Sequence, residues 1–310
     1  MSLIVVVQMG SVSPARVAED STVALMLEAR RRGHELFRCA PDALSLNDGK
    51  VCALVEHVSH DDFDTEHSIG LDTMDLAACD VVLMRQDPPV DMGYLSATHL
   101  LERLHPDTLV VNDPVQVRNS PEKLFATEFQ DFIPPTLISR SIEEISDFRS
   151  DWGDIVMKPL YGAAGSGVVM IKREDENFAS LVEIFSATYR EPWVIQKYLP
   201  EVKLGDKRVI IVDGLVAGVV NRIPATGEFR SNFACGGKGV AASLTDREIA
   251  ICEHLGPILR ARGLIFVGID LVAEYLMEIN VTSPTGIRPV DQFDGKDVAS
   301  MVWDAIEVRC

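Results

Sequence analysis

The sequence predicts an α/β fold, with a parallel sheet in its N-terminal part and an α+β arrangement in its C-terminal part. Two observations lead to this prediction. Over the first third of the chain, short apolar runs alternate with segments of helical apolar spacing, which is typical of parallel strands joined by crossover helices. Further along, apolar runs follow each other across glycine-containing turns, which is the order of antiparallel hairpins.

Four strands and two helices are predicted in the first third of the chain. Residues 2–9 form a continuous apolar run, as expected for a strand that is covered on both faces. A helix follows, with Ser21 as its cap, three arginines in its last turn and Gly33 after its end. The other strands cover residues 34–39, 81–85 and 108–112, and the second helix covers residues 94–104.

The middle of the chain combines helix-capping signals with a hairpin. Ser120 and Pro121 predict a cap followed by proline at the first helical position. The segment SIEE at residues 141–144 has the pattern of a capping box. Strands at residues 154–160 and 168–173 flank a glycine-rich turn, so we expect them to pair with each other.

Two more hairpins are predicted in the C-terminal part. Asp213-Gly214 is a strong two-residue turn signal between strands at residues 208–212 and 215–223. Thr245 opens a capping box and a helix that runs to about residue 263, with a kink at Pro257. The last hairpin pairs residues 265–272 with 275–281, and a helix follows from about Gly295.

These changes of pattern place domain boundaries near residues 120 and 200. The expected units are an N-terminal α/β domain at residues 1–120, a small domain at 121–200 and a C-terminal domain at 201–310. The third unit contains the candidate metal residues.

The composition excludes several classes of protein. The chain has 29 Lys and Arg against 47 Asp and Glu, a formal net charge of −18, which argues against broad binding to nucleic acid or to acidic membranes. This net charge does not exclude the binding of a small anionic ligand in a local basic pocket. No apolar run approaches a membrane span, and the N-terminal residues lack signal-peptide features. The six cysteines form no CxxC pair, so we expect a reduced, cytoplasmic protein.

Three residues of the last predicted hairpin form the candidate metal site. Glu278 and Asn280 are two residues apart, so they point to the same face of a strand, and Asp270 lies on the preceding strand. Hard oxygen ligands of this kind suit Mg²⁺. No basic neighbour in the sequence neutralises the two acids, which favours a metal over the alternative of acids on a solvated hairpin face.

Two lysines and a glycine-rich segment form the candidate phosphate site. Lys158 ends an apolar strand, and Lys123 lies in the first turn of the helix predicted after Pro121. The segment after Lys158 contains Gly162, Gly165 and Gly167, whose backbone N–H groups can face phosphate. A glycine-rich hairpin without a ligand is the alternative reading of this segment.

Several arginines are notable in an acidic protein. Arg222 ends a strand, and Arg230 lies in a glycine-rich loop at residues 224–243 that is either a mobile lid or an ordinary surface loop. Arg288 follows the strand that carries Glu278 and Asn280, and its guanidinium can bind a carboxylate through two hydrogen bonds. The acidic segment with His57, His60 and His67 has no usual zinc spacing and is interpreted as a solvated loop.

Six segments in this order give the chain a family resemblance. It resembles the ATP-grasp ligases, and within them it is most similar to the bacterial glutathione synthetase family. The matching segments are residues 83–103, 111–125, 157–168, 196–214, 221–239 and 263–288. The resemblance implies an N-terminal α/β substrate domain followed by a two-part ATP-grasp module, in which the small domain is a lid and ATP lies between it and the C-terminal domain.

The resemblance also implies a role for each matching residue. Contacts with ATP would come from Lys123, Lys158, Gly162, Gly165, Gly167, from the adenine hinge Gln196, Tyr198 and Leu199, and from Asp206 near the ribose. Mg²⁺ or Mn²⁺ would be held by Asp270, Glu278 and Asn280. The transferred phosphate would face Arg208, Arg222 and Arg230, and the peptide substrate would contact Ser283 and Arg288.

The implied reaction joins γ-glutamylcysteine to glycine through an acyl phosphate, with ATP as co-substrate. The implied partners are these small molecules and a second copy of the chain, as a homodimer or homotetramer, without nucleic acid or membrane. Two alternatives stay open from the residues. One is another ATP-grasp ligase with a different acid and amine, and the other is a nucleotide-binding regulatory protein without turnover.

Overall fold

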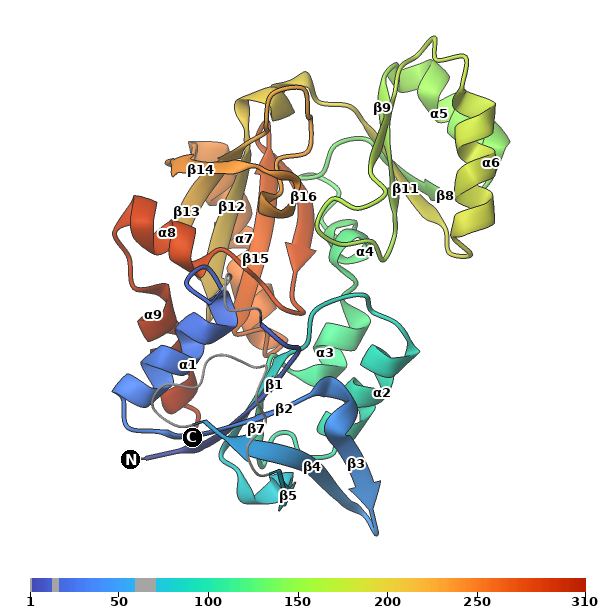
Figure 1. Ribbon diagram of the computed structural model, residues 1–310. Helices are drawn as coiled ribbons and strands as arrows, with labels where there is room; N and C mark the ends of the chain where they lie inside the picture. Colours follow the sequence, from blue (N-terminus) through green and yellow to red (C-terminus); the bar gives the residue numbers. More distant parts are fainter. Residues whose placement is uncertain (1, 13–16, 59–70) are drawn as a thin grey trace.

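The computed structural model describes residues 2–12, 17–58 and 71–310, and Figure 1 shows three sheets in succession along the chain. The N-terminal sheet has the strand order β3-β4-β2-β1-β6-β7, with β5 paired to β4. Its central strands run parallel, as predicted: β1 (Ile4–Met9), β2 (Glu35–Cys39), β6 (Val81–Arg85) and β7 (Leu109–Val111). The helices of this region are α1 (Ser21–Arg31), α2 (Met92–Leu101) and α3 (Pro114–Asn119).

The N-terminal sheet also contains three antiparallel strands that the sequence analysis missed. They are β3 (Leu44–Asn47), β4 (Lys50–His57) and β5 (Asp72–Asp75). The sheet is therefore mixed rather than purely parallel. Asp48-Gly49 joins β3 to β4 with positive φ at both residues, so the same turn signal that predicted the Asp213-Gly214 hairpin was present here.

Two predicted caps are wrong by a few residues. Asp20, not Ser21, caps α1, since its carboxylate accepts from the backbone N–H of Val23. The helix predicted after Ser120 is present as α4 (Glu122–Ala126), but Pro121 occupies its cap and Glu122 its first position, one residue later than predicted. At α1 the aspartate accepts from a free N–H group of the first turn, whereas no side chain caps α4.

The small sheet is antiparallel, with the order β10-β9-β11-β8. Its strands are β8 (Thr136–Ser139), β9 (Ile155–Pro159), β10 (Val169–Ile171) and β11 (Trp193–Lys197), which confirms the hairpin around the glycine-rich turn. Helices α5 (Ile142–Trp152) and α6 (Phe178–Thr188) pack on it and close a separate apolar core. Ser141 caps α5, but the carboxylate of Glu144 accepts from Ser139 instead of completing the predicted capping box.

The large sheet has the order β14-β13-β12-β15-β16 and is also antiparallel. Its strands are β12 (Asp206–Val212), β13 (Leu215–Ile223), β14 (Lys238–Ala241), β15 (Phe266–Val272) and β16 (Tyr275–Asn280). The Asp213-Gly214 hairpin and the capping box at Thr245 are both confirmed. The helices are α4 (Glu122–Ala126), α7 (Asp246–Ala261), α8 (Ile287–Asp294), which was not predicted, and α9 (Val298–Glu307).

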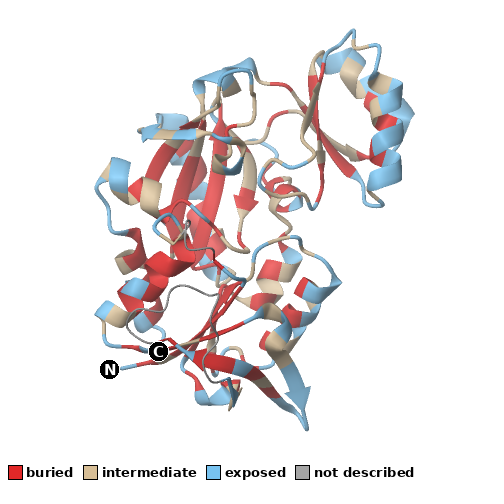
Figure 2. Cartoon of the chain, viewed as in Figure 1, coloured by how far each residue is buried: buried red, intermediate tan, exposed pale blue. Residues whose placement is uncertain are grey.

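Two apolar cores each join the N-terminal sheet to the large sheet (Figure 2). Helix α7 contributes Ile251, Leu255 and Leu259 to one core, while α9 contributes Val302 and Trp303 to the other. The large sheet is thus covered on both faces, and the N-terminal sheet shares its apolar contacts. Among the described residues, none of the helices combines the length and the apolar character needed to cross a membrane.

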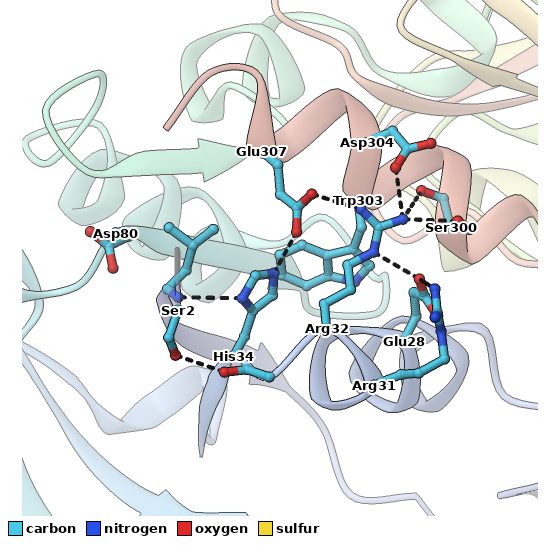
Figure 3. A network of polar contacts seen from close by, with 12 residues as sticks. Ser2, Glu28, Arg31, Arg32, His34, Asp80, Ser300, Trp303, Asp304 and Glu307 are labelled. Atoms are coloured by element: carbon cyan, nitrogen blue, oxygen red, sulfur yellow. Dashed lines mark hydrogen bonds and ion pairs between the residues drawn. The ribbon is translucent and has the colours of Figure 1, made fainter.

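A polar network fastens the end of α1 to α9 (Figure 3). The guanidinium of Arg32 lies 2.7 Å from the carboxylates of Glu28 and Asp304 and 2.8 Å from that of Glu307. His34 Nε2 lies 3.0 Å from Glu307, and its Nδ1 accepts from the N–H of Leu3. We call these groups the α1–α9 network; it holds two distant parts of the sequence together.

The network predicts a pH dependence of stability. Burial lowers the pKa of His34, so the unfolded chain binds a proton at a higher pH than the folded chain does. As pH falls from 7 towards 5, this residue alone should lower the free energy of unfolding by up to about 1.4 kcal/mol per pH unit. Urea unfolding at several pH values is the measurement, and His34→Gln should make the slope shallower; an unchanged slope would contradict the prediction.

Candidate active site

A pocket of about 110 Å³ lies between the small sheet and the large sheet. Its walls come from β9 and β11 on one side, from β15 and β16 on the other, and from the loop between β13 and β14. Most residues predicted for ATP and metal line it: Lys123, Lys158, Gly162, Gly165, Gln196, Tyr198, Leu199, Asp206, Arg230, Asp270 and Glu278.

The other predicted site residues do not line this pocket. They are Gly167, Arg208, Arg222, Asn280, Ser283 and Arg288. Gly167 has φ +68° and packs so closely that an added Cβ would lie 2.5 Å from the Tyr189 hydroxyl, so close packing explains this glycine. Apolar residues such as Val156 and Met277 also line the pocket, and they were not predicted because a strand pattern cannot distinguish them from core residues.

The two lysines lie in different electrostatic surroundings. Lys158 Nζ donates to Gln196 Oε1 at 2.7 Å, and burial lowers its pKa. Lys123 donates to Glu122 and to the carbonyl of Gly162, which joins α4 to the glycine-rich loop. Burial opposes its charge, but the carboxylates of Glu122 and Glu278 outweigh this and raise the pKa of Lys123. Both ammonium groups face the same pocket and can meet an anionic ligand.

The predicted carboxylates meet across the β15–β16 pair. Asp270 lies directly opposite Glu278, and Gly268 lies opposite Asn280. Burial, with a further contribution from the carboxylates of Glu122 and Asp270, raises the pKa of Glu278 to about 8. This part of the pocket therefore favours a cation.

Three arginines were predicted near the phosphate, and two of them are buried in ion pairs. Arg208 binds both carboxylate oxygens of Asp270, and Arg222 Nη2 lies 2.9 Å from Asp270 and also contacts Asp206. Burial alone would raise the pKa of Asp270, but these guanidiniums outweigh it and hold that pKa below its usual range. No basic residue is a sequence neighbour of the acids, but arginines of β12 and β13 balance the charge of Asp270 without a metal, which the sequence pattern did not indicate.

The third arginine joins two loops at the mouth of the pocket. Arg230 Nη1 donates to the carbonyl of Gly165 at 3.1 Å, and its Nη2 lies 2.6 Å from Glu228. The hydrogen bonds from Arg230 lower the pKa of Glu228 to about 2. Gly165 has φ +78°, and a Cβ there would lie 2.8 Å from Asn232 Oδ1. Close approach of the loops therefore requires glycine at this position.

The predicted substrate residues lie where the N-terminal sheet meets the large sheet. The Ser283 hydroxyl donates to the carbonyl of Arg85 at 3.4 Å, and the Arg85 guanidinium donates to the carbonyl of Pro284 at 2.8 Å. Arg288 Nε is buried and has no hydrogen-bond partner among the described residues. Of the histidine-rich segment, His57 ends β4, while His60 and His67 fall outside the described residues.

The residues at β15 and β16 fit a divalent cation only with help from a ligand. No group of three or more His, Cys, Asp or Glu side chains in the described ranges is arranged to hold a metal ion. Asp270 also pairs with arginines, so in the described structure the carboxylate of Glu278 and the side-chain oxygen of Asn280 are the oxygen ligands without an arginine partner, and Asp270 is the third. Oxygen ligands that are few in number match Mg²⁺, which usually keeps waters and substrate phosphates in its shell.

Family models match nearly the whole chain. The N-terminal domain of prokaryotic glutathione synthetase matches residues 3–118, and the ATP-grasp domain of prokaryotic glutathione synthetase matches residues 122–295. The glutathione synthetase of Agrobacterium fabrum is 53% identical over 307 residues, which cover 98% of this chain and 96% of the relative. The glutathione synthetase of Synechocystis is 43% identical, with 89% and 90% of the two chains covered.

Solved structures show the same fold at low identity. The D-cycloserine synthetase DcsG has a TM-score of 0.71 at 14% identity, with 99% of this chain and 100% of that one covered. The ATP-grasp ligase PsnB, solved with a precursor variant, Mg and ADP, has a TM-score of 0.65 at 20% identity, with 100% and 99% covered. The predicted fold class is therefore confirmed. By its family models and its full-length relatives, the chain belongs to the prokaryotic glutathione synthetase family and is an ATP-grasp ligase.

Proposed function

We propose that the chain ligates γ-glutamylcysteine with glycine, consuming ATP and giving glutathione, ADP and phosphate. The observation that supports this most directly is the pocket itself. Two lysines and two facing carboxylates line one cavity between the small and the large sheet, in a chain that matches glutathione synthetases over its full length. The division at residues 120 and 200 remains a proposal for the domains that enclose it.

ATP would lie in this pocket with its phosphates towards the lysines. Lys123 and Lys158 would neutralise phosphate oxygens, assisted by backbone N–H groups of the glycine-rich loop. Gln196, Tyr198 and Leu199 would contact the adenine, and Asp206 would lie near the ribose. Bound Mg²⁺, or Mn²⁺, would be held by Asp270, Glu278 and Asn280 and would supply charge neutralisation between the phosphates.

The proposed reaction has two steps. A carboxylate oxygen of the cysteinyl residue attacks the γ-phosphorus of ATP, the bond to the bridging oxygen breaks, and ADP leaves. The amine of glycine then attacks the acyl carbon, loses a proton, and displaces phosphate to form the peptide bond. Arg230 would face the transferred phosphate directly, while Arg208 and Arg222 would act from behind it by fixing Asp270 and Asp206.

Selection of the peptide substrate would depend on residues outside the ATP pocket. Ser283 follows β16 and contacts Arg85 of the N-terminal sheet, and the guanidinium of Arg288, whose Nε has no hydrogen-bond partner among the described residues, can meet a carboxylate. The choice of glycine as acceptor, a homodimeric or homotetrameric state and a cytoplasmic location are further expectations from family membership.

The test is a phosphate-release assay with ATP and Mg²⁺, in which γ-glutamylcysteine and glycine are omitted singly and together. We expect release to need both substrates and the product to have the mass of glutathione. Release only with another acid or amine would overturn the substrate assignment while leaving an ATP-grasp ligase. Binding of ATP without release under any condition would favour a regulatory protein.

A further inference from the structure

The loop between β13 and β14, residues 224–237, is hydrogen-bonded to the large sheet through one of its own residues, Ser231. Ser231 is only 3% exposed, although it lies in a loop with exposed residues such as Thr226. Its hydroxyl donates to Asp206 Oδ2 at 3.0 Å. A buried hydroxyl that bonds to a buried carboxylate on β12 is an anchor, because breaking this bond would leave the carboxylate with fewer donors.

The carboxylate that receives this bond belongs to a chain of buried ion pairs. Asp206 Oδ2 also accepts from Arg222, and Arg222 pairs with Asp270, which in turn pairs with Arg208. The other carboxylate oxygen of Asp206 has no hydrogen-bond partner among the described residues. In the described structure, Ser231 and Arg222 are the side chains that donate to this carboxylate. Ser231 therefore connects the β13–β14 loop to the charged groups beside the pocket.

The loop beyond Ser231 is compact, so an anchor at one residue restrains its neighbours. The N–H groups of Cys235 and Gly237 both donate to the carbonyl of Asn232. A Cβ on Gly237 would lie 1.9 Å from the carbonyl oxygen of Ser231, so the chain closes on itself tightly. After this turn the chain enters β14, where Gly239 lies opposite Arg222.

The restraint acts most directly on Arg230, the residue next to Ser231 in the loop. It precedes Ser231, donates to the carbonyl of Gly165 in the glycine-rich loop, and lines the pocket. Its carboxylate partner, Glu228, lies on the same loop and moves with it, so this ion pair cannot fix Arg230 relative to the sheet. The hydrogen bond from Ser231 to Asp206 can fix Arg230 relative to the sheet, because Asp206 belongs to β12.

We propose that Ser231 is a positioning residue, which fastens the β13–β14 loop to Asp206 and so holds Arg230 over the pocket during ligation. The part of this inference that concerns ligation rests on the proposed function. The part that concerns the loop does not, because it can be measured on the protein without substrates.

The first measurement is the rate at which trypsin cleaves the Arg230–Ser231 bond of the folded, ligand-free protein. Ser231→Ala should raise this rate about tenfold, because the loop opens more often when one hydrogen bond to a charged acceptor is lost. Thr226→Ala, which removes an exposed hydroxyl from the same loop, is the control and should cleave at the wild-type rate. Peptides spanning residues 224–238 with Ser or Ala correct for any preference of trypsin itself. Equal cleavage rates for Ser231→Ala and wild type would refute the proposal that Ser231 fastens the loop to Asp206.

The second measurement is the ratio of phosphate released to peptide formed. If Arg230 is held over the acyl phosphate, loosening the loop should let water reach this intermediate, so the ratio should rise above one in Ser231→Ala. The turnover number should fall about tenfold, with less change in the KM for ATP. A purely structural role would lower turnover and melting temperature but leave the ratio at one, and that result would overturn the positioning role.

Discussion

Replacing Arg222 by alanine is expected to reduce turnover by a factor of about 10²–10³ and also to destabilise the fold. The guanidinium is 2% exposed and bridges Asp206 and Asp270, so its removal leaves two buried carboxylates without their shared cation. Breaking a buried ion pair from one side costs about 3–5 kcal/mol of folding free energy. Phosphate release measures the turnover number, and urea unfolding measures the free energy of unfolding.

Two further variants separate the causes of these effects. Arg222→Lys keeps the charge, but the lysine ammonium does not reach as far as Nη2, the nitrogen of Arg222 that contacts both acids, so its turnover should stay low while part of the stability returns. Arg173→Ala, at a side chain that is 60% exposed, is the control and should behave as wild type. Wild-type turnover in Arg222→Ala would refute the role proposed for this residue.

Replacing Lys158 by methionine is expected to have an equally large effect on turnover but the opposite effect on stability. Lys158 Nζ bonds to Gln196 and has no carboxylate within ion-pairing distance in the described structure, and burial lowers its pKa. Methionine fills a similar volume without a charge, so the fold should be as stable as wild type or more stable. The turnover number should fall by about 10²–10³, because the transferred phosphate loses a cation.

The matched control for Lys158 is Lys172→Met, at an exposed lysine just after β10 of the same small sheet. It should change neither turnover nor stability. A Lys158→Met protein that ligates at the wild-type rate would remove this lysine from the phosphate site. A protein that loses activity only because it unfolds would show a lowered urea midpoint, contrary to the expectation.

Local signals predicted the parts of the fold that short segments determine. The Asp213-Gly214 hairpin and the Thr245 capping box depend on a few adjacent residues, and both are present. The hairpin β3–β4 was missed because β3 has only four residues, most of them exposed, so it shows little apolar alternation. Helix α8 was missed because it begins after Gly286 and contains Pro289, which both weaken a helical pattern.

The candidate site could be predicted as a set of residues but not as a set of contacts. Strand alternation placed Glu278 and Asn280 on one face, and the hairpin brought Asp270 opposite Glu278. The pairing of Asp270 with Arg208 depends on the register between β12 and β15, which no local signal determines. Ser231 gave no signal at all, because its importance comes from a carboxylate that lies 25 residues earlier in the chain.

During translation, α1 leaves the ribosome long before α9 is made. At ordinary rates of synthesis, the roughly 270 residues between them take about 15 to 50 s. Throughout this interval, the apolar residues of α1 and β1 that pack with Val302 and Trp303 lack part of their core, and Arg32 lacks two of its carboxylate partners. The nascent N-terminal sheet therefore exposes apolar surface to which chaperones can bind. Its native packing is complete only after residues 298–307 have been synthesised.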